Sequence, residues 1–503
     1  MKKIIIIFSF IIILYNQAFA NIEVKTSLGI SGEWKVNKWA PLFINIKNLG
    51  SKVSLKVDIL FTQGLRFSGN SKTLYTYDFE IPALSTRSLE VLLPPLDFRY
   101  PLEINITSQE RNIDYKQKLE YNLERAVLPI ILIIGERQNL RFFLPSKTRV
   151  INIVNEKDLP TNYKAYDGID LILVDYNFWR QISTNRKNAL RLCRIFNNNV
   201  YFFEEVNNIF QNFKFSPAKI QFFPPTFLES QDLSILDMQK FLYPNRVEIL
   251  FILFFYFITL YFIRRFLKLR FQNIIILVII ILACFIAMYK GDLFRKDALI
   301  VGEKNLVYLT PQKEIAEIYS HIVVFSPFKR ELNFNVSDNV IQIYQPFYQP
   351  QRGIGILNID QNKEEGRLYI EKNKISFIEY LSLLLFPLKI TYNIKNENIE
   401  LSLENDSSFL IRNLHLNIED KSYYLGELKN GERKNWKVSL RNLTKEEDIF
   451  SPTFSQWKVK SDIINNEKIV LWGKIENSLL AINIRGVKYS IKYDNLLIVP
   501  LKN

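Results

Sequence analysis

YFIRRFLKLRFQN, residues 261–273, places a group of cations between two strongly apolar runs. VEILFILFFYFITLYFI (247–263) precedes this group and IIILVIIILACFIAMY (274–289) follows it. Each run comes close to the length that an α-helix needs to cross the hydrocarbon core of a bilayer. The pattern predicts a two-helix transmembrane hairpin with a basic loop over 264–273, and a buried hairpin of a soluble protein is the alternative. The cations of the loop are Arg264, Arg265, Lys268 and Arg270.

The N-terminus has the features of a secretory signal peptide over residues 1–20. Two lysines precede an apolar run, and Ala18 and Ala20 supply the small residues of a cleavage site. An uncleaved anchor helix is the alternative. Because a signal peptide directs the rest of the chain out of the cytoplasm, the loop between the two spans is expected on the cytoplasmic side, where short loops collect Lys and Arg. The four cations are then topology-determining, and they also suit anionic lipid headgroups. The predicted location is the bacterial inner membrane, with both large regions outside.

The charge, cysteine and histidine content argues against several classes of protein. The net charge is +14, and part of it lies in the loop, so the rest of the chain is only mildly basic. A nucleic-acid partner is not expected, because no concentrated basic face interleaved with aromatics is apparent in the sequence. Cys193 and Cys284 are not expected to pair, and His321 and His415 are far apart in strand-like segments. No spacing typical of a metal site occurs, so no cofactor is predicted.

Residues 21–125 are predicted to form an antiparallel β-sandwich. KVSLKVDIL (52–60) and LEINITS (102–108) alternate apolar and polar residues, and turn residues separate such runs at short intervals. A sandwich of this kind displays surfaces rather than chemistry. Trp34, Trp39 and Phe67 are candidates for a sugar-stacking platform, with packing in the core as the alternative.

Residues 126–240 change to an α/β pattern. AVLPIILIIGE (126–136) is a continuous apolar run, as in a strand that is buried on both faces of a parallel sheet. A second such strand is expected over 170–175, a helix over 183–196 and a further strand over 200–203. Alternation of strand and helix indicates a parallel layer with right-handed crossovers.

This order resembles the glutamine-amidotransferase-like, flavodoxin-like domain of a family of uncharacterised bacterial membrane proteins. The matching segments are YDGIDLILVDY (166–176), the helix at Ala189-Leu190, and LGELKNGERKNWKVSL (425–440) near the end of the chain. The resemblance implies an Ig-like domain before the α/β domain, and two transmembrane helices and a β-rich region after it. Asparagines occupy 197–199, where family members usually have Gly-Gly.

The α/β domain is expected to lack catalytic activity. An amidotransferase needs a nucleophilic cysteine after the strand at 200–203 and a histidine partner, and the sequence supplies neither there. Cys193 lies on the apolar side of the predicted helix. Asp170 and Asp175 lie at the two ends of the strand predicted over 170–175 and face opposite sides of it. Asp175 is a weak candidate for binding Mg²⁺ or phosphate, because it follows the carboxyl end of a strand; helix capping is the alternative.

The remaining two regions, 290–395 and 396–503, are predicted to be β-rich, with a second sandwich over the latter. ISFIEYLSLLLFPLKI (375–390) is apolar, but Glu379 and Pro387 argue against a full span. Buried core or an interfacial segment is expected there, and a third span is the alternative. The dipeptide Asn430-Gly431 predicts a hairpin turn.

Together these features predict a multidomain α+β membrane protein: a β-sandwich, a flavodoxin-like domain, a transmembrane hairpin and a C-terminal β-rich sandwich region. The expected function is that of a non-catalytic envelope protein which binds or scaffolds protein partners in a membrane complex. An accessory subunit of a polysaccharide synthesis or export system, which binds glycan, is the alternative.

Overall fold

The computed structural model describes most of the chain between residues 22 and 501. The described residues are 22–36, 38–65, 69–95, 100–108, 113–120, 128–136, 148–197, 199–203, 254, 257–258, 261, 265, 299–311, 314–326, 328–345, 355–371, 374–395, 398–418, 421–439, 469–486 and 489–501.

The chain divides into two compact units, each of which is assembled from three stretches of sequence. The first unit comprises Met1–Phe227, Val336–Gly366 and Tyr380–Leu383. The second unit comprises Leu228–Asn335, Arg367–Glu379 and Leu384–Asn503.

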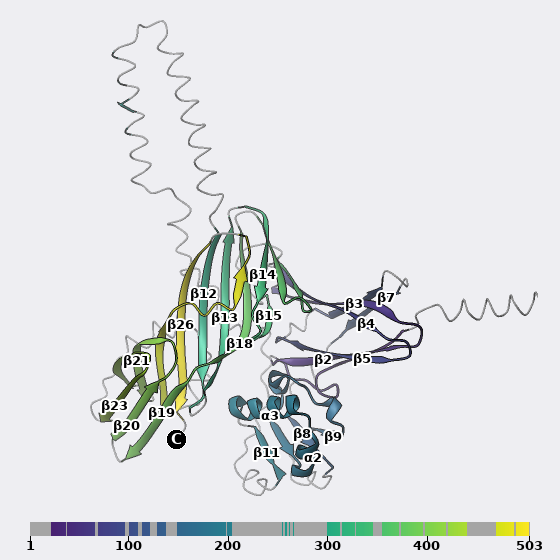
Figure 1. The fold of residues 1–503 in the computed structure, drawn as a ribbon, viewed down its shortest axis with the longest axis horizontal. Helices are drawn as coiled ribbons and strands as arrows, with labels where there is room; N and C mark the ends of the chain where they lie inside the picture. Colours follow the sequence, from purple (N-terminus) through teal and green to yellow (C-terminus); the bar gives the residue numbers. More distant parts are fainter. Residues whose placement is uncertain are drawn as a thin grey trace, which may run out of the picture. The chain divides into compact units, whose positions relative to one another are not determined.

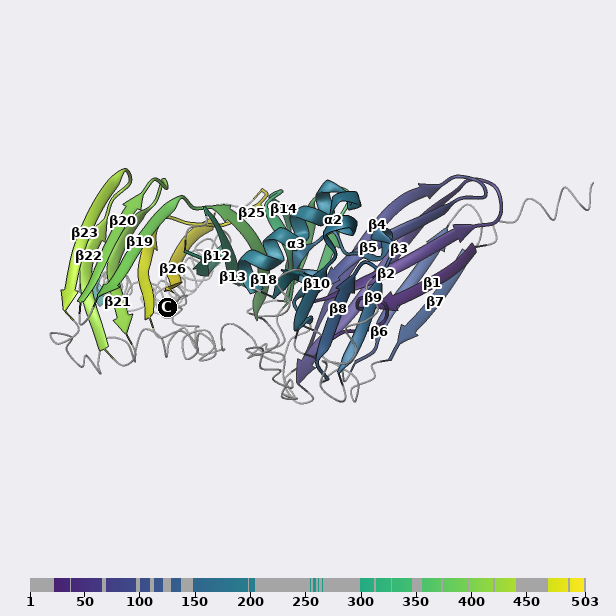
Figure 2. The same cartoon turned by 90° about the horizontal axis from the view of Figure 1, so that it is seen from below.

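Two β-sheets lie face to face in the first unit (Figures 1 and 2). The smaller sheet has the order β1-β2-β5, and the larger one contains the run β16-β4-β3-β6-β7, in which β16 is parallel to β4. In β6 the side chains alternate between buried and partly buried, because successive residues of a strand point to opposite faces. The strands are β1 (Ile22–Leu28), β2 (Ala40–Asn48), β3 (Val53–Leu65), β4 (Gly69–Ile81), β5 (Thr86–Leu93), β6 (Leu102–Ser108), β7 (Ile113–Leu119) and β16 (Gly355–Asp360).

A small parallel sheet follows in the same unit, with the order β11-β10-β8-β9. Its central strand β8 is buried at every residue, which explains the continuous apolar run in the sequence. The strands are β8 (Ile130–Ile134), β9 (Arg149–Ile153), β10 (Leu171–Val174) and β11 (Val200–Phe202). Helices α2 (Tyr176–Gln181) and α3 (Thr184–Asn197) connect β10 to β11.

The fold class predicted from the sequence is wrong, and so is the resemblance that supported it. The described residues form mainly β-strands, and α2 and α3 are their two α-helices. The connection from β9 to β10 contains only the 3-10 turns η3 (Glu156–Asp158) and η4 (Tyr163–Tyr166), so it lacks the α-helical crossover that a flavodoxin-like domain requires. Asn155 and Asn162 cap these turns with their side chains and favour short turns over an α-helix there.

The predicted transmembrane hairpin is not supported either. Among the described residues, no helix is both long and apolar enough to span a bilayer. α3 is 14 residues long and carries several cations. The runs 247–263 and 274–289, the basic loop and the signal region 1–20 lie outside the described residues, apart from five single positions. The apolar segment 375–390 belongs to strands β18 (Lys374–Leu385) and β19 (Leu388–Lys395) rather than to a helix.

Most strands of the second unit lie in two further sheets. One contains the run β18-β13-β12-β26-β24-β21-β22, in which β12 and β26 are parallel, and the other has the order β19-β20-β23. Further strands of this unit are β14 (Arg330–Val336), β17 (Glu365–Ile370) and β25 (Ile482–Ile484). The strands of the two sheets are β12 (Leu299–Leu309), β13 (Ile315–Ser326), β20 (Asn398–Asn405), β21 (Leu410–Ile418), β22 (Lys421–Leu428), β23 (Glu432–Ser439), β24 (Ile469–Glu476) and β26 (Tyr489–Leu501), with β18 and β19 as above.

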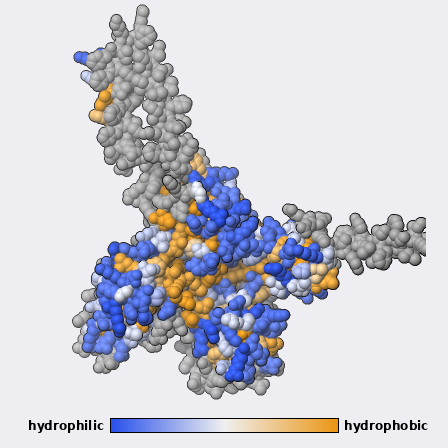
Figure 3. All heavy atoms as spheres, in the orientation of Figure 1, coloured by the Kyte–Doolittle hydropathy of each residue, from blue (hydrophilic) through white to orange (hydrophobic). Residues whose placement is uncertain are grey.

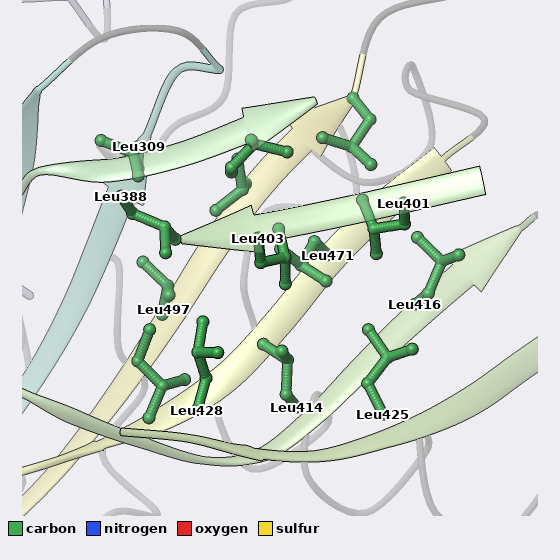
Figure 4. Close-up of a cluster of buried hydrophobic side chains, with 14 of the residues drawn as sticks. Leu309, Leu388, Leu401, Leu403, Leu414, Leu416, Leu425, Leu428, Leu471 and Leu497 are labelled. Atoms are coloured by element: carbon green, nitrogen blue, oxygen red, sulfur yellow. The ribbon is translucent and has the colours of Figure 1, made fainter. Parts of the chain in front are cut away.

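A leucine-rich core joins the sheet β19-β20-β23 to the larger sheet (Figure 4). Leu401 and Leu403 point from β20 toward Leu414, Leu416, and Leu471 of the larger sheet, and all five are almost fully buried. Complete burial of a leucine side chain stabilises a fold by about 1.5–3 kcal/mol. The inner face of β20 is therefore fixed, and its outer face is free for other residue types.

The turn at Asn430-Gly431 is present, but it does not close a hairpin. β22 and β23, which it connects, belong to different sheets. Gly431 has a φ of +70°, and its N–H donates to the carbonyl of Asn405 on β20. The turn thus carries the chain from one layer of the sandwich to the other.

Candidate functional site

A groove of about 500 Å³ lies on the sheet β19-β20-β23. Three consecutive residues from each strand line it: Thr391, Tyr392, Asn393, Glu400, Leu401, Ser402, Asn435, Trp436 and Lys437. The lobe that contains these strands presents mostly hydrophilic residues in Figure 3. The groove is the candidate functional site because it combines a hollow surface with clustered hydrogen-bonding side chains.

Strand register explains how the groove is built. Tyr392, Leu401 and Trp436 are aligned across the three strands, and their side chains pack toward the leucine-rich core. Their backbone therefore forms the floor of the groove. The residues on either side of them point outward, because side chains alternate along a strand.

Two polar rows result on the outer face. Ser402 is paired with Thr391 on one side and with Asn435 on the other. In the next row Glu400 is paired with Asn393 and Lys437. Neighbouring strands are about 4.8 Å apart, and successive outward residues about 7 Å apart, so six side chains present donors and acceptors over a small area.

Charges at the groove are balanced. The Lys437 amine lies 3.9 Å from a carboxylate oxygen of Glu400. At the end of the sheet the Lys389 amine donates to Asp406 at 2.7 Å and to Glu404 at 3.3 Å. These hydrogen bonds, that with Asp406 foremost, raise the pKa of Lys389. The groove thus offers hydrogen bonds without a strong field of either sign.

A row of aromatic side chains crosses β22, β21 and β24 in the same unit. The His415 ring stacks on Trp472 and also contacts Tyr424, at a centroid distance of 5.0 Å. The indole N–H of Trp472 donates to Asn417 Oδ1 at 2.9 Å. Burial lowers the pKa of His415 to about 4, so the imidazole is neutral at pH 7. Tyr424, on the outermost strand of the run, is 56% exposed.

Two more buried polar groups occur in the second unit. His321 Nδ1 lies 3.1 Å from Glu379 Oε1, and Phe377 packs on the imidazole at 5.2 Å. Glu303 accepts hydrogen bonds from Ser478 Oγ at 2.5 Å and from the Leu479 N–H at 3.1 Å. Burial raises the pKa of Glu303. In each cluster the buried acid has hydrogen-bonding neighbours, which suits a structural role.

The structure separates Asp170 from Asp175. Asp175 Oδ1 accepts the N–H of Asn177 at 2.8 Å and caps α2. Asp170 accepts from the Lys35 amine at 2.6 Å and from the Ile130 N–H at 2.8 Å. Capping of α2 therefore accounts for Asp175, the weak candidate for binding Mg²⁺ or phosphate. Among the described residues, no group of three or more His, Cys, Asp or Glu side chains could hold a metal ion.

The other candidate residues from the sequence either pack in the core or lie outside the described residues. Cys193 is fully buried, with its Sγ 3.3 Å from Asn199 Oδ1. Trp39 is 5% exposed and meets Tyr344 edge-on at 5.6 Å, so it belongs to the core rather than to a sugar platform. Phe67, Ala18, Ala20 and the loop cations Arg264, Lys268 and Arg270 lie outside the described residues.

Sequence reasoning missed the groove residues. TYNIK (391–395) and NIELSLEN (398–405) do alternate, and their polar positions supply Asn393, Glu400 and Ser402. That alternation could have indicated a polar sheet face. It could not show that three strands align these positions.

One family model and several solved structures resemble parts of the chain. A model described as a domain of unknown function (DUF8726) matches residues 21–122, and no curated protein matches. A CARDB domain from Pyrococcus furiosus, solved in complex with di-metal ions, is 22% identical over 22% of this chain and 82% of that chain, with a TM-score of 0.14. The yeast δ-COP-I μ-homology domain, complexed with a Dsl1 WxWxV peptide, is 6% identical over 40% of this chain and 95% of that chain, with a TM-score of 0.23. A β-glucosidase from Listeria innocua, in complex with glucose, is 16% identical over 20% of this chain and 16% of that chain, with a TM-score of 0.15. At these TM-scores the likenesses carry no argument about function.

Proposed function

We propose that the chain is a non-catalytic binding protein of the extracytoplasmic space and that its groove on β19-β20-β23 binds an uncharged glycan. The observation that carries this proposal is the pair of polar rows, Thr391–Ser402–Asn435 and Asn393–Glu400–Lys437, on one outward sheet face. Hydroxyl, amide and carboxylate groups match the alternating donors and acceptors of sugar hydroxyls. The balanced charges favour a neutral polymer over an ionic one.

An extended peptide fits the same surface less well. A peptide that added to the sheet would have to pair with an outer strand, β19 or β23. Both strands carry cations there, including Lys389, Arg433 and Lys437, and such residues oppose strand addition. The ligand is therefore expected to lie across the sheet face and not along its edge.

The test is titration of the full chain with neutral oligosaccharides by calorimetry, after a glycan array has supplied the probe. Asn393→Ala/Asn435→Ala removes one amide from each row and is expected to weaken binding about tenfold, since each lost hydrogen bond costs roughly 0.5–1.5 kcal/mol. Asn358→Ala/Asn483→Ala is the matched control, because both asparagines are exposed on strands outside the groove. Equal affinities of the two double variants would refute the groove as the site.

A scaffold for protein partners is the second candidate function. Tyr424 favours it, since this tyrosine is 56% exposed on β22, at the end of the run β21-β22, and tyrosine is a frequent anchor of protein interfaces. Chemical crosslinking in native extracts should then capture a specific partner, and Tyr424→Ala should reduce that capture. A Tyr424→Ala protein that captures the same partner in the same yield would exclude this surface.

The extracytoplasmic location rests on the predicted signal peptide. N-terminal sequencing of protein isolated from cells should find a mature chain that begins at Asn21. A chain that retains residues 1–20 and fractionates with the cytoplasm would overturn the proposed location.

A further inference from the structure

Three aromatic rings from α2 and β11, those of Tyr176, Trp179 and Phe202, form a cluster in the first unit. Phe202 meets Tyr176 at a centroid distance of 6.0 Å and Trp179 at 5.5 Å, both edge-to-face. Tyr176 is 47% exposed, and the other two rings are half-buried. Rings locked edge-to-face form a rigid base for a ligand that packs on them.

Each of the three rings has an arginine guanidinium over it, in a cation–π contact. The guanidinium of Arg180 lies 4.7 Å from the centroid of Tyr176, that of Arg191 lies 5.9 Å from Trp179, and that of Arg194 lies 5.9 Å from Phe202. A guanidinium group over a ring is attracted to its π-face and carries N–H donors along its edge that can bind a carboxylate; one of these donors in Arg191 also reaches Asn188 Oδ1, at 3.5 Å. We call these six residues the arginine–aromatic surface.

The two helices that contribute to this surface contain no carboxylate of their own. Residues 176–197 hold five cations and no Asp or Glu. No ion pair among the described residues includes Arg180, Lys187 or Arg191. Lys187 donates to the Arg180 carbonyl at 3.0 Å, which places its charge beside the same helix pair. The preceding carboxylate, Asp175, is engaged in capping α2. The positive charge of Arg180 and Arg191, which no ion pair among the described residues offsets, points to an anionic partner.

We propose that the arginine–aromatic surface binds an acidic polysaccharide, whose carboxylates accept paired hydrogen bonds from Arg180 and Arg191. The guanidinium fork matches a carboxylate in both geometry and charge. A polymer that repeats its carboxylate can engage several arginines at once.

Two other polyanions fit less well. Nucleic-acid bases need open ring faces on which to stack. Here guanidinium groups and edge-to-face contacts already occupy the rings. A lipid surface needs protruding apolar side chains, whereas Trp179 and Phe202 are half-buried. The arginine–aromatic surface belongs to the first unit, and binding there is independent of the glycan groove in the second.

The test compares oligogalacturonate with its fully methyl-esterified form, which keeps the sugar rings and removes the charge. Calorimetry on the full chain should detect binding of the acid and none of the ester. Arg180→Gln/Arg191→Gln should weaken binding at least tenfold and flatten its dependence on salt. Arg180→Lys/Arg191→Lys keeps the charge and loses the guanidinium fork. Its affinity for oligogalacturonate should therefore lie between that of the unaltered chain and that of Arg180→Gln/Arg191→Gln.

Lys116→Gln/Lys118→Gln is the matched control. Both lysines are exposed on β7 in ion pairs with Asp114 and Glu103, and the double variant removes the same charge from the same unit. It should bind like the unaltered chain, and thermal melting should show that both double variants are folded. The groove variant Asn393→Ala/Asn435→Ala should also retain the acid ligand.

Several results would overturn the proposal. Absence of oligogalacturonate binding is one. Another is an equal loss of affinity in Lys116→Gln/Lys118→Gln, because net charge alone would then explain the loss in the arginine variant. Tighter binding of single-stranded DNA or of phosphatidylglycerol vesicles, abolished by Arg180→Gln/Arg191→Gln, would assign the surface to that other polyanion.

Discussion

The imidazole of His415 lies parallel to the indole of Trp472, with 4.3 Å between ring centroids and 4° between ring planes. Its Nδ1 is 3.3 Å from Ser422 Oγ, and the residue is 4% exposed. A stacked, buried imidazole is stable in its neutral form and must lose solvation to take up a proton. This arrangement makes the stability of the second unit depend on pH.

Acid is therefore expected to destabilise the chain through His415. Its pKa is about 4 in the folded state and ordinarily 6.5, so between these values the unfolded state binds more protons. The free energy of unfolding should be highest above pH 6.5 and fall as the pH drops toward 4. After allowance for solvent screening, the loss is about 1–2 kcal/mol.

Urea unfolding of the unaltered chain and of His415→Phe, at pH 7.5 and pH 4.5, measures this loss. Phenylalanine keeps the stack and cannot titrate, so the variant should lose less stability in acid. All other groups are common to both proteins and cancel in the difference. Equal losses in the two proteins would show that His415 does not titrate as described.

The Lys35–Asp170 pair is expected to be important because it is buried. The two side chains are 7% and 17% exposed, and Asp170 also holds the Ile130 N–H. Lys35→Met leaves a buried carboxylate without its cation and should cost about 3 kcal/mol in urea unfolding. Adding Asp170→Asn should restore part of this loss, since the charge is then gone.

An exposed pair provides the control for this prediction. Lys116 and Asp114 are 2.9 Å apart and more than half exposed, so Lys116→Met should change stability by less than about 0.5 kcal/mol. If Lys35→Met cost no more than Lys116→Met, the buried pair would not hold the start of β8 in place.

Gly135 is expected to resist substitution more strongly than Gly431. Gly135 has a φ of +121°, and an added Cβ would lie 2.5 Å from the Cβ of Asp175. Gly431 has a φ of +70° with no atom within 4 Å of an added Cβ. Gly431→Ala should therefore cost about 1 kcal/mol from backbone strain alone, while Gly135→Ala adds a steric clash. Similar unfolding midpoints for both variants would contradict the close approach of Gly135, directly after β8, to Asp175, directly before α2.

Local elements could be predicted from the sequence where one pattern dominates. The strand expected over 170–175 is present as β10, and the helix expected over 183–196 is present as α3. The step from these elements to a flavodoxin-like domain failed, because the segment between β9 and β10 forms capped 3-10 turns. The sequence predicted one strand–helix–strand unit, β10–α3–β11, correctly. One such unit does not specify a doubly wound fold, because every crossover of that fold must contain a helix.

Long-range pairings could not be predicted at all. β12 pairs in parallel with β26, where Asn305 lies opposite Asn495, nearly two hundred residues later. Asn430-Gly431 is a strong local signal for a hairpin, yet the flanking strands separate because their apolar faces pack against each other across the core. The groove depends on one local and one more distant pairing, since β19 and β20 are close in sequence whereas β23 pairs with β20 only after β21 and β22.

The last prediction links the core beneath the groove to binding. Leu403 is fully buried on β20, between the outward residues Ser402 and Glu404, whereas Leu385 is 66% exposed in the same unit. Leu403→Ala should cost about 3 kcal/mol, as the transfer term and the remaining cavity add. Leu385→Ala, the matched control, should stay within about 0.5 kcal/mol. Because Leu403 anchors the strand that carries Glu400 and Ser402, its loss should also weaken binding of the neutral glycan, measured without urea at a temperature where the variant is folded. Unchanged glycan affinity in a destabilised Leu403→Ala chain would show that the outer face keeps its shape without the leucine beneath it.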